Sequence, residues 1–413
     1  MANRMHNKLP FLKTSGTKIV DETGKTVVLR GVALGGWLMM EGYILGGRNL
    51  PEKVFRQEFE KTLGKEALEE FTKSFRRSFI NEYDFNLIKE WGANCVRLPF
   101  NYRLIEYEDR PFSLNEEGLR VLDNAVKWCQ DHGLYCILDM HAAPGAQNPD
   151  WHSDCVGKPE LFTSDANKER YARLWHFLAS HYKDVSAVAG YDILNEPVID
   201  IHKEKELKEL YLRVTKEIRD IDTRHIIFLE GNIFGQRLDF IGKPEDENTA
   251  FSVHAYPITD YVFNFEKDLT YPGRVYNIPW SRKSLELISL PYRMLADKVN
   301  VPLFVGEVGI NWRGGHYGEL RWAKDLLDIF ERYGISWTYW TYKSVATAIH
   351  PDGIFRYVKS PEWVNHKGPL TGLETFSSAW PKHKSRMAAS WKTENFKRND
   401  QLYALLKKYF EKN

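Results

Sequence analysis

Two glutamates that each end an apolar, strand-like run are the residues of this sequence best suited to chemistry. Asn195-Glu196-Pro197 closes the run GYDILNEP, and Glu307 lies near the end of the run VPLFVGEVG. Two carboxyl groups brought to one place can cleave a glycosidic bond, because one protonates the leaving oxygen while the other attacks or stabilises the developing oxocarbenium ion. The two lie 111 residues apart, so they meet only in a closed or strongly wound fold. We therefore take a retaining β-glycosidase as the working hypothesis.

The elements that must position these glutamates are eight β-rich runs that alternate with helical patterns. Residues 116–133 and 320–334, for example, carry apolar side chains at spacings of three and four, as amphipathic helices do. The alternation predicts an α/β fold, a (β/α)8 TIM barrel, in which residues 1–413 form a single catalytic domain. The predicted strands lie within 27–38, 93–100, 134–145, 188–197, 225–232, 250–257, 301–309 and 334–342.

The sequence outside these repeats predicts three further features. Residues 17–21 and 25–28, around Glu22-Thr23-Gly24, are typical of a small β-hairpin, which we expect to plug the bottom of the barrel. Residues 395–410 have helical spacing and predict the last outer helix. The long segments 258–300 and 343–394 are expected to lie over the catalytic face, where the loops of such barrels carry function.

The composition favours a neutral substrate. Lys and Arg total 57 against 56 Asp and Glu, a net charge of +1, which offers no electrostatic reason to expect nucleic acid or a membrane as partner. No apolar stretch is long enough for a signal peptide or a spanning helix, so we expect a soluble, cytoplasmic protein. The four cysteines have no metal-type spacing and are expected to be free thiols. We expect no metal and no other cofactor, and the oligomeric state stays open.

Polar side chains recur where the predicted strands end. In a barrel such side chains face the mouth. Each has a plainer explanation when it is taken alone, since Glu196 could cap a helix, Arg97 could form a structural salt bridge, and a histidine or Trp340 could belong to the core. Because such residues follow most of the predicted strands, together they favour a functional site at the mouth of the barrel. The residues are Glu41, Arg97, His141, Asn195, Glu196, His254, Tyr256, Glu307 and Trp340.

Several segments together resemble glycoside hydrolase family 5, and most of all its fungal exo-β-1,3-glucanase and glycosylceramidase-like branch. The segments are LRGVALGGWLMMEG, DMHAAPGAQN, NEP, HAY and GEVG, and they span the chain from about Leu29 to Trp340. The resemblance implies a (β/α)8 barrel and a retaining β-glycosidase that needs no metal or organic cofactor.

The resemblance also implies a role for each matched residue. Glu196 would be the general acid and base, kept protonated near neutral pH, and Glu307 the nucleophile. Asn195 would bind the sugar 2-OH. Arg97 and Tyr256 would hold Glu307 as a carboxylate.

The remaining matched residues would hold the sugar. His141 and His254 would bind hydroxyl groups or orient the carboxylates. Trp340 would stack beneath the sugar ring, and Glu41 would bind hydroxyls of the terminal sugar.

The chain departs from the family pattern in two places. After Gln147-Asn148 it reads PDWHSD where the fungal enzymes have a Gly-Phe-Asp type continuation, and we assign sugar binding to Asp150 rather than to Asp154. GEVG replaces the commoner GEW or GEF, which removes an aromatic side chain beside the nucleophile. The aglycone side is therefore expected to differ.

Hydrolysis of β-glucosidic bonds, by an exo-acting β-glucosidase or exo-β-1,3-glucanase on short oligosaccharides or glucosides, is the function we expect. The aromatic segment 258–300 leaves open a glucosidase for apolar aglycones, such as glucosylceramide or sterol glucoside. A transglycosylase, a non-catalytic sugar-binding barrel, and β-mannoside or β-1,4-glucan specificity are further alternatives, because a fold does not fix a function.

Overall fold

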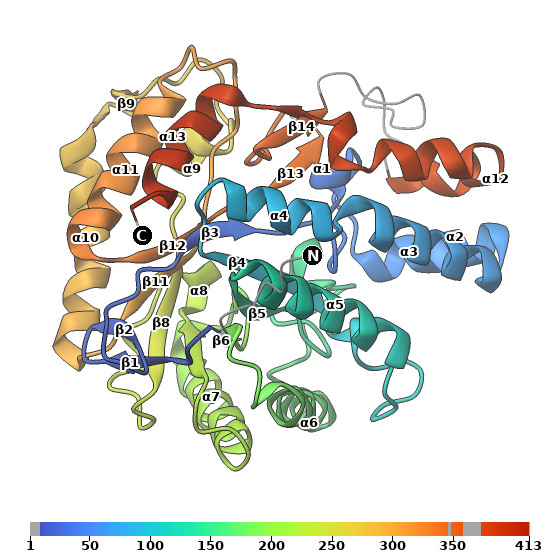
Figure 1. The fold of residues 1–413 in the computed structure, drawn as a ribbon, viewed down its shortest axis with the longest axis horizontal. Helices are drawn as coiled ribbons and strands as arrows, with labels where there is room; N and C mark the ends of the chain where they lie inside the picture. Colours follow the sequence, from blue (N-terminus) through green and yellow to red (C-terminus); the bar gives the residue numbers. More distant parts are fainter. Residues whose placement is uncertain (1–8, 346–347, 358–372, 413) are drawn as a thin grey trace, which may run out of the picture.

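A closed barrel of eight parallel strands forms the body of the molecule (Figure 1). The computed structural model describes residues 9–345, 348–357 and 373–412. Each predicted strand segment overlaps one barrel strand, so the predicted (β/α)8 fold is confirmed. The strands follow one another around the barrel as β3 (Arg30–Ala33), β4 (Cys95–Asn101), β5 (Tyr135–Ala142), β6 (Val188–Asp192), β7 (Ile226–Glu230), β8 (Thr249–His254), β11 (Leu303–Val308) and β12 (Ser336–Tyr339), which pairs with β3.

Helices surround the barrel, and the sequence shows why they form where they do. In α5 the Asn115 side chain accepts a hydrogen bond from the Gly118 N–H at the start, and Gly133 ends the helix in the left-handed conformation. The predicted helices within 116–133 and 320–334 are confirmed. The outer helices are α4 (Glu82–Glu90), α5 (Glu116–His132), α6 (Asp165–Tyr182), α7 (Glu204–Arg219), α10 (Arg282–Val299), α11 (Glu319–Tyr333) and α13 (Asp400–Phe410), with the short α8 (Asn232–Gly235) between β7 and β8.

A small hairpin closes the bottom of the barrel, as predicted. The predicted turn at Glu22-Thr23-Gly24 is present, because Val20 forms an antiparallel bridge with Thr26 and the Val27 N–H donates to the Ile19 carbonyl at 2.9 Å. A second pairing, which was not predicted, joins β1 (Leu12–Ser15) to β2 (Lys18–Asp21) through a turn at Gly16. Gly16 has a φ of +58°, which favours glycine. Leu12 of the hairpin packs with barrel-interior residues such as Phe304, so the hairpin continues the core.

A second layer of helices, which the sequence analysis did not identify, extends from one side of the barrel. α2 (Glu52–Leu63) and α3 (Lys65–Phe79) form a helical pair, and α12 (Leu373–Ser390) packs against both (Figure 1). The expectation that all of 343–394 covers the catalytic face is therefore wrong for α12, because its aromatic side chains meet Phe71 of α3. Residues 346–347 and 358–372 of that segment lie outside the described residues.

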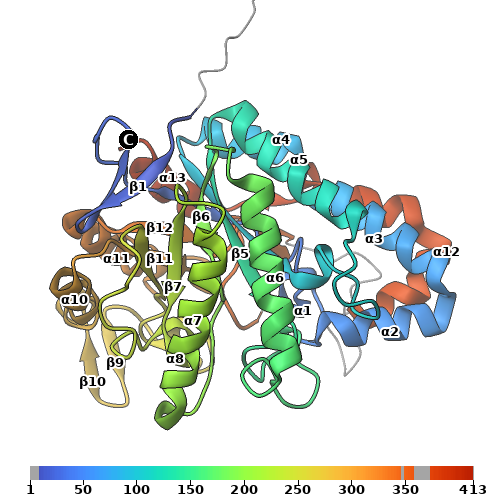
Figure 2. The ribbon, with the colours of Figure 1, turned by 90° about the horizontal axis from the view of Figure 1, so that it is seen from below.

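The segment between β8 and β11 contains more regular structure than the sequence indicated. It forms α9 (Thr259–Val262), the hairpin of β9 (Gly273–Val275) and β10 (Ile278–Trp280), and then α10, which lies beside α11 on the outside of the barrel (Figure 1). The hairpin and α8 lie toward the same end of the barrel in Figure 2. Three further short strands, β13 (Lys343–Val345), β14 (Phe355–Tyr357) and β15 (Lys397–Arg398), form a separate sheet near α1 (Gly42–Leu45).

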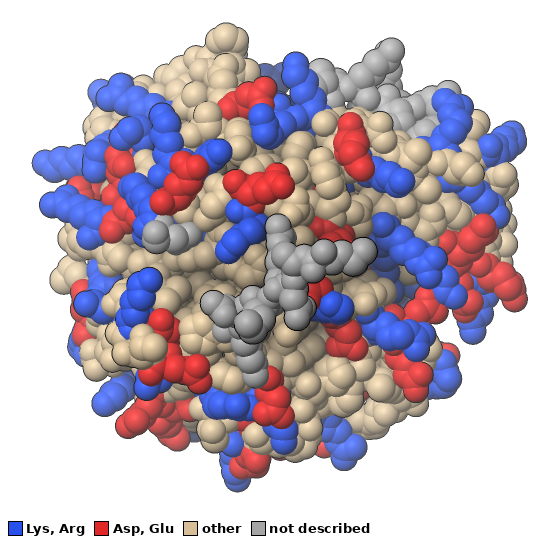
Figure 3. Space-filling view, in the orientation of Figure 1, with Lys and Arg blue, Asp and Glu red and all other residues tan. Residues whose placement is uncertain are grey.

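The surface gives no sign of a strongly charged partner. On the face shown in Figure 3, basic and acidic side chains are interspersed, in agreement with the net charge of +1. No helix within the described ranges is long and apolar enough to cross a membrane.

Candidate active site

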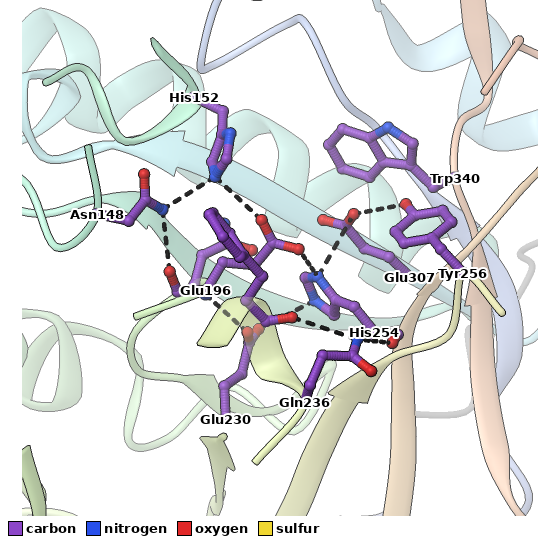
Figure 4. A network of polar contacts seen from close by, with 12 residues as sticks. Asn148, His152, Glu196, Glu230, Gln236, His254, Tyr256, Glu307 and Trp340 are labelled. Carbon is purple, nitrogen blue, oxygen red and sulfur yellow. Dashed lines mark hydrogen bonds and ion pairs between the residues drawn. The ribbon is translucent and has the colours of Figure 1, made fainter. Parts of the chain in front are cut away.

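The carboxyl ends of the strands bring the two predicted glutamates together. Glu196 follows β6 and Glu307 lies in β11, and both meet His254 at the end of β8 (Figure 4). One carboxylate oxygen of each glutamate and one nitrogen of His254 lie within 4.8 Å of one another. This close approach fits the separation of about 5–5.5 Å between the carboxyl groups of retaining glycosidases, and it leaves too little room for the water of an inverting one.

Glu307 is held from two sides. Arg97 Nη1 donates to Glu307 Oε1 at 2.8 Å, and the Tyr256 hydroxyl donates to Oε2 at 2.7 Å. The strand register of β11 shifts between Val305 and Glu307 relative to β8, so Glu307 and His254 are opposite each other at the barrel mouth. The expected contacts of Arg97 and Tyr256 with Glu307 are therefore present.

Arg97 of β4 donates hydrogen bonds to residues of the strands β6, β7 and β11 and of the loop that follows β6. Its side chain is fully buried, and it donates to Asp192 at 2.9 Å, to Asn195 at 2.9 Å and to Glu230 at 3.0 Å, in addition to Glu307. A buried guanidinium requires such anionic and polar partners, because an unpaired charge in the interior is strongly unfavourable. Burial alone lowers the pKa of Arg97, but the surrounding carboxylates outweigh it and raise the pKa.

Glu196 is fixed through its backbone and its side chain. Its φ of +46° lies in the left-handed region, which is strained for a residue with a side chain. Glu230 stabilises this conformation by accepting from the Glu196 backbone N–H at 2.7 Å. The Glu196 carboxylate lies 2.6 Å from His254 Nδ1 and 3.0 Å from His152 Nε2.

These histidines change the expected protonation of the site. Burial alone raises the pKa of Glu196, but His254 and His152 outweigh it and lower the pKa well below its usual range. Burial alone lowers the pKa of His254, but Glu230, Glu307 and Glu196 outweigh it and raise the pKa. These directions run against the expectation that Glu196 is kept protonated near neutral pH: the pKa of Glu196 is lowered, whereas that of His254, whose Nδ1 lies 2.6 Å from a Glu196 oxygen, is raised.

Several other buried groups of the site have shifted pKa values. Burial raises the pKa of Glu41 and of Asp139 to about 8 in each case, and it also raises the pKa of Asp192. Burial alone lowers the pKa of His152, but its contact with Glu196 raises it to about 9. The acidic side chains of Glu196, Glu230 and Glu307 each contact a basic side chain, among them Arg97, His152 and His254.

A second group of predicted residues lies together on one wall of the site. The rings of His141 and Trp340 are stacked, with centroids 5.5 Å apart and planes 4° from parallel. Glu41 Oε1 lies 3.9 Å from His141 Nε2 and has no hydrogen-bond partner among the described residues. A neutral, buried carboxyl group that is unpaired on one side is suited to binding a hydroxyl group.

The two aspartates that follow Asn148 have different surroundings. Asp150 lines the cavity, whereas Asp154 is buried away from it and contacts Arg103, Asn101 and the backbone of Lys53. Asp154 is a structural residue, which agrees with the choice of Asp150 as the acid near the sugar.

Four residues of this network were not identified from the sequence. Glu230 and Asp192 end the strands β7 and β6, so the rule that identified Glu307 could have found them, whereas Asp139 lies within β5, two residues before His141. His152 carried no such signal, because it lies in a loop. Its position depends on Asn148, whose Nδ2 donates to the Glu196 carbonyl at 2.9 Å and also lies 2.9 Å from His152 Nε2.

The site opens into a cavity of about 650 Å³, a size typical of small-molecule sites. Glu196 and Glu307 lie among its lining residues together with many aromatic and aliphatic side chains. Glu196, His254 and Glu307 are also a group whose ligand atoms could hold a metal ion. In this structure a hydrogen bond of 2.6 Å joins His254 Nδ1 and Glu196 within this group.

Comparison with known proteins agrees with this geometry. Residues 59–345 match the family described as Cellulase (glycosyl hydrolase family 5). A Beta-xylosidase of Phanerodontia chrysosporium is 36% identical over 350 residues, which are 82% of this chain and 71% of that protein. Endoglucanase C of Acetivibrio thermocellus is 27% identical over 71% of this chain and 92% of its own length. A Glucan 1,3-beta-glucosidase of Candida oleophila is 32% identical over 47% of this chain and 48% of its own length.

Solved structures show the same fold. Endoglucanase Cel5A from Thermotoga maritima superposes with a TM-score of 0.59 at 21% identity, over 79% of this chain and 92% of that one. The family match covers more than half of the chain, and its strand ends carry the paired carboxyl groups of a retaining enzyme. The chain belongs to glycoside hydrolase family 5 and is a retaining β-glycoside hydrolase.

Proposed function

We propose that the protein is an exo-acting β-glucosidase or exo-β-1,3-glucanase that acts on short oligosaccharides or glucosides. The observation that carries the exo assignment is a contact between segments that follow three different strands. The His350 ring lies 4.8 Å from that of Tyr43 and 5.6 Å from that of Trp151. All three line the cavity. A cleft that passes a polymer through would need these segments to stand apart, whereas a pocket for a chain end is closed by their contact.

Support for glucose comes from the relatives, of which one is named a glucan 1,3-beta-glucosidase and another an endoglucanase. The relative at 36% identity is named a beta-xylosidase, which makes xylose the second candidate for the sugar. The two sugars differ only in the hydroxymethyl group on C5, so they require the same catalytic residues.

In the proposed mechanism, Glu307 attacks the anomeric carbon while Glu196 protonates the leaving oxygen. The proton reaches Glu196 from His254 Nδ1 along the 2.6 Å contact. A glycosyl ester on Glu307 forms as the aglycone leaves, and Glu196, now a base, activates the water that cleaves the ester. Arg97 and Tyr256 stabilise the Glu307 carboxylate before attack and as it leaves.

The sugar in this mechanism lies in the cavity against the wall formed by Glu41, His141 and Trp340. Trp340 is placed to stack against the ring, and the neutral Glu41 carboxyl group binds a hydroxyl. The Asn195 Nδ2 group is buried and without a hydrogen-bond partner among the described residues, so it is available for the 2-OH, and Asp150 completes the wall. Such contacts contribute to catalysis when they strengthen in the transition state.

Two assays test the proposal. Aryl β-glucoside, β-xyloside, β-mannoside and β-galactoside are compared for kcat/KM, and the glucoside is expected to be the best substrate. A laminari-oligosaccharide of four or five sugars is then digested, and glucose is expected as the first and main product. Early release of products of two or three sugars would contradict exo action, and a preference for xyloside would assign the site to xylose.

A further inference from the structure

The cavity extends beyond the catalytic carboxylates to the outer side of the barrel wall. Its lining includes Val253 of β8 and Leu303 and Val305 of β11, which alternate with residues of the barrel interior such as Ser252 and Phe304. Opposite them it includes Ile288, Ser289 and Tyr292 of α10. We call this part of the cavity the α10 crevice. Figure 1 shows α10 on the outer flank of the barrel, beside α11.

The helix over this crevice is loosely packed. Only Leu285 and Ala296 of the 18 residues of α10 are buried, whereas α7 buries six residues of 16. Leu287 and Met294 are 60% and 61% exposed, so apolar surface of α10 is left without cover. Pro291 lies within the helix and has no N–H to donate to the preceding turn, which weakens the helix beside the crevice.

The crevice begins on the side of the site from which the aglycone leaves. Glu196 protonates the leaving oxygen in the proposed mechanism, so the aglycone lies next to Glu196 and away from Trp340. From Glu196 the lining continues through Phe234 and Gln236. The Tyr292 hydroxyl donates to Gln236 Oε1 at 2.9 Å, so the aglycone side of the site and α10 are directly connected.

The uncharged lining of the α10 crevice favours an apolar aglycone over a second sugar. Its described wall residues are uncharged, and the Ser289 hydroxyl already donates to the Leu285 carbonyl within the helix. A second sugar placed there would lose water without gaining polar partners. Val253, Leu303 and Val305 are only 2–3% exposed, so the crevice is narrow, which suits a thin, flexible chain better than a rigid ring system.

We propose that the α10 crevice binds a linear alkyl aglycone, so that alkyl β-glucosides, or glucolipids with such a chain, are substrates. This inference rests on the proposed β-glucosidase function. Burial of one CH₂ group is worth about 0.8 kcal/mol, and a tenfold rate change corresponds to about 1.4 kcal/mol. Each methylene that enters the crevice can therefore raise kcat/KM by up to about fourfold.

A series of β-glucosides with ethyl, butyl, hexyl and octyl aglycones tests this inference below the concentrations at which they form micelles. The leaving-group acidity is nearly constant along the series, so a change in kcat/KM reports on binding of the chain. We expect kcat/KM to rise from ethyl to hexyl. A flat series, or a stronger preference for a sterol glucoside or a disaccharide than for the octyl compound, would overturn the inference.

Two matched variants locate the effect. Ser289→Phe fills the crevice and should remove the increase of kcat/KM with chain length, whereas Leu287→Phe places the same new side chain on the exposed side of α10 and should leave that increase as in the parent enzyme. A Ser289→Phe enzyme that keeps the slope would overturn the inference. If Ser289→Phe does not fold, Ser289→Leu introduces a smaller side chain into the crevice and should likewise reduce the increase of kcat/KM with alkyl chain length.

An aryl β-glucoside measured in parallel separates this test from that of the proposed function. Turnover of the aryl glucoside with a flat alkyl series would contradict the crevice inference alone. Absence of turnover on every glucoside, with a folded protein, would contradict the proposed function itself.

Discussion

Removal of the positive charge of His152 should move the alkaline limb of the pH profile to higher pH. His152 Nε2 lies 3.0 Å from Glu196 Oε2, and the two side chains are only 12% and 13% exposed. A hydrogen bond to a charged group contributes about 1.5–3 kcal/mol, and one pKa unit corresponds to about 1.4 kcal/mol. Because a nearby cation stabilises the anion, its loss in His152→Ala should raise the pKa of Glu196 by about 1–2 units.

The assay is kcat/KM against pH for a glucoside with a poor leaving group, because this ratio reports the ionisation of the free enzyme. Activity falls at high pH when the pair of Glu196 and His254 loses the proton needed by the leaving oxygen. We expect the alkaline limb to move to higher pH in His152→Ala, because a cation beside the pair is lost, and to move by less in His152→Gln, which keeps a neutral donor. His176→Ala, which removes a half-exposed histidine of α6, should leave the profile unchanged.

Two results would refute this reasoning. An alkaline limb that stays in place or moves to lower pH in His152→Ala would mean that His152 does not control the proton of Glu196. A uniform loss of kcat/KM at every pH, without displacement of the limb, would mean that His152 contacts the substrate and leaves the acid unaffected.

Three other substitutions test separate parts of the site. Glu196→Ala should lower kcat/KM on laminaribiose by about 10²–10⁴-fold but far less on dinitrophenyl β-glucoside, whose leaving group needs no proton, and equal losses on both would contradict the acid role. Glu230→Gln weakens the charged contacts with Arg97 and His254, so the free energy of unfolding in urea should fall by about 2 kcal/mol, and an unchanged value would contradict this. Glu41→Leu should raise KM at pH 7 more than Glu41→Gln, because the carboxyl group with a pKa of about 8 is neutral there, and equal effects would contradict hydroxyl binding by Glu41.

The barrel could be predicted because its strands and helices leave periodic patterns in the sequence. The run 301–306, for example, is apolar throughout, as buried parallel strands are. The additional helices α2, α3 and α12 were not identified because their apolar faces are buried against one another and belong to no strand and helix repeat. The predicted turn at Glu22-Thr23-Gly24 is present, but the strand β1, which pairs with the other side of β2 through the turn at Gly16, was not identified.

The sequence indicated several residues that the structure brings together at the site, but it did not indicate their pKa shifts. The strand-end rule found Arg97 and Glu307, and the structure brings both into contact. The charge on Glu196 depends on His152, whose loop position no periodic pattern specifies, and on Glu230, which holds His254 on its other side at 3.2 Å. A pKa depends on such neighbours in space, so the sequence order of the residues could not reveal it.

The central claim is that Glu307 forms a covalent bond with the sugar. The most direct measurement is to incubate the enzyme with an activated 2-fluoro β-glucoside, which slows release of the sugar, and to analyse the intact protein and its peptides by mass spectrometry. We predict one added fluoroglucosyl group, located on the peptide that contains Glu307, and none in Glu307→Gln. A label on another residue, or turnover that survives in Glu307→Gln, would contradict the account.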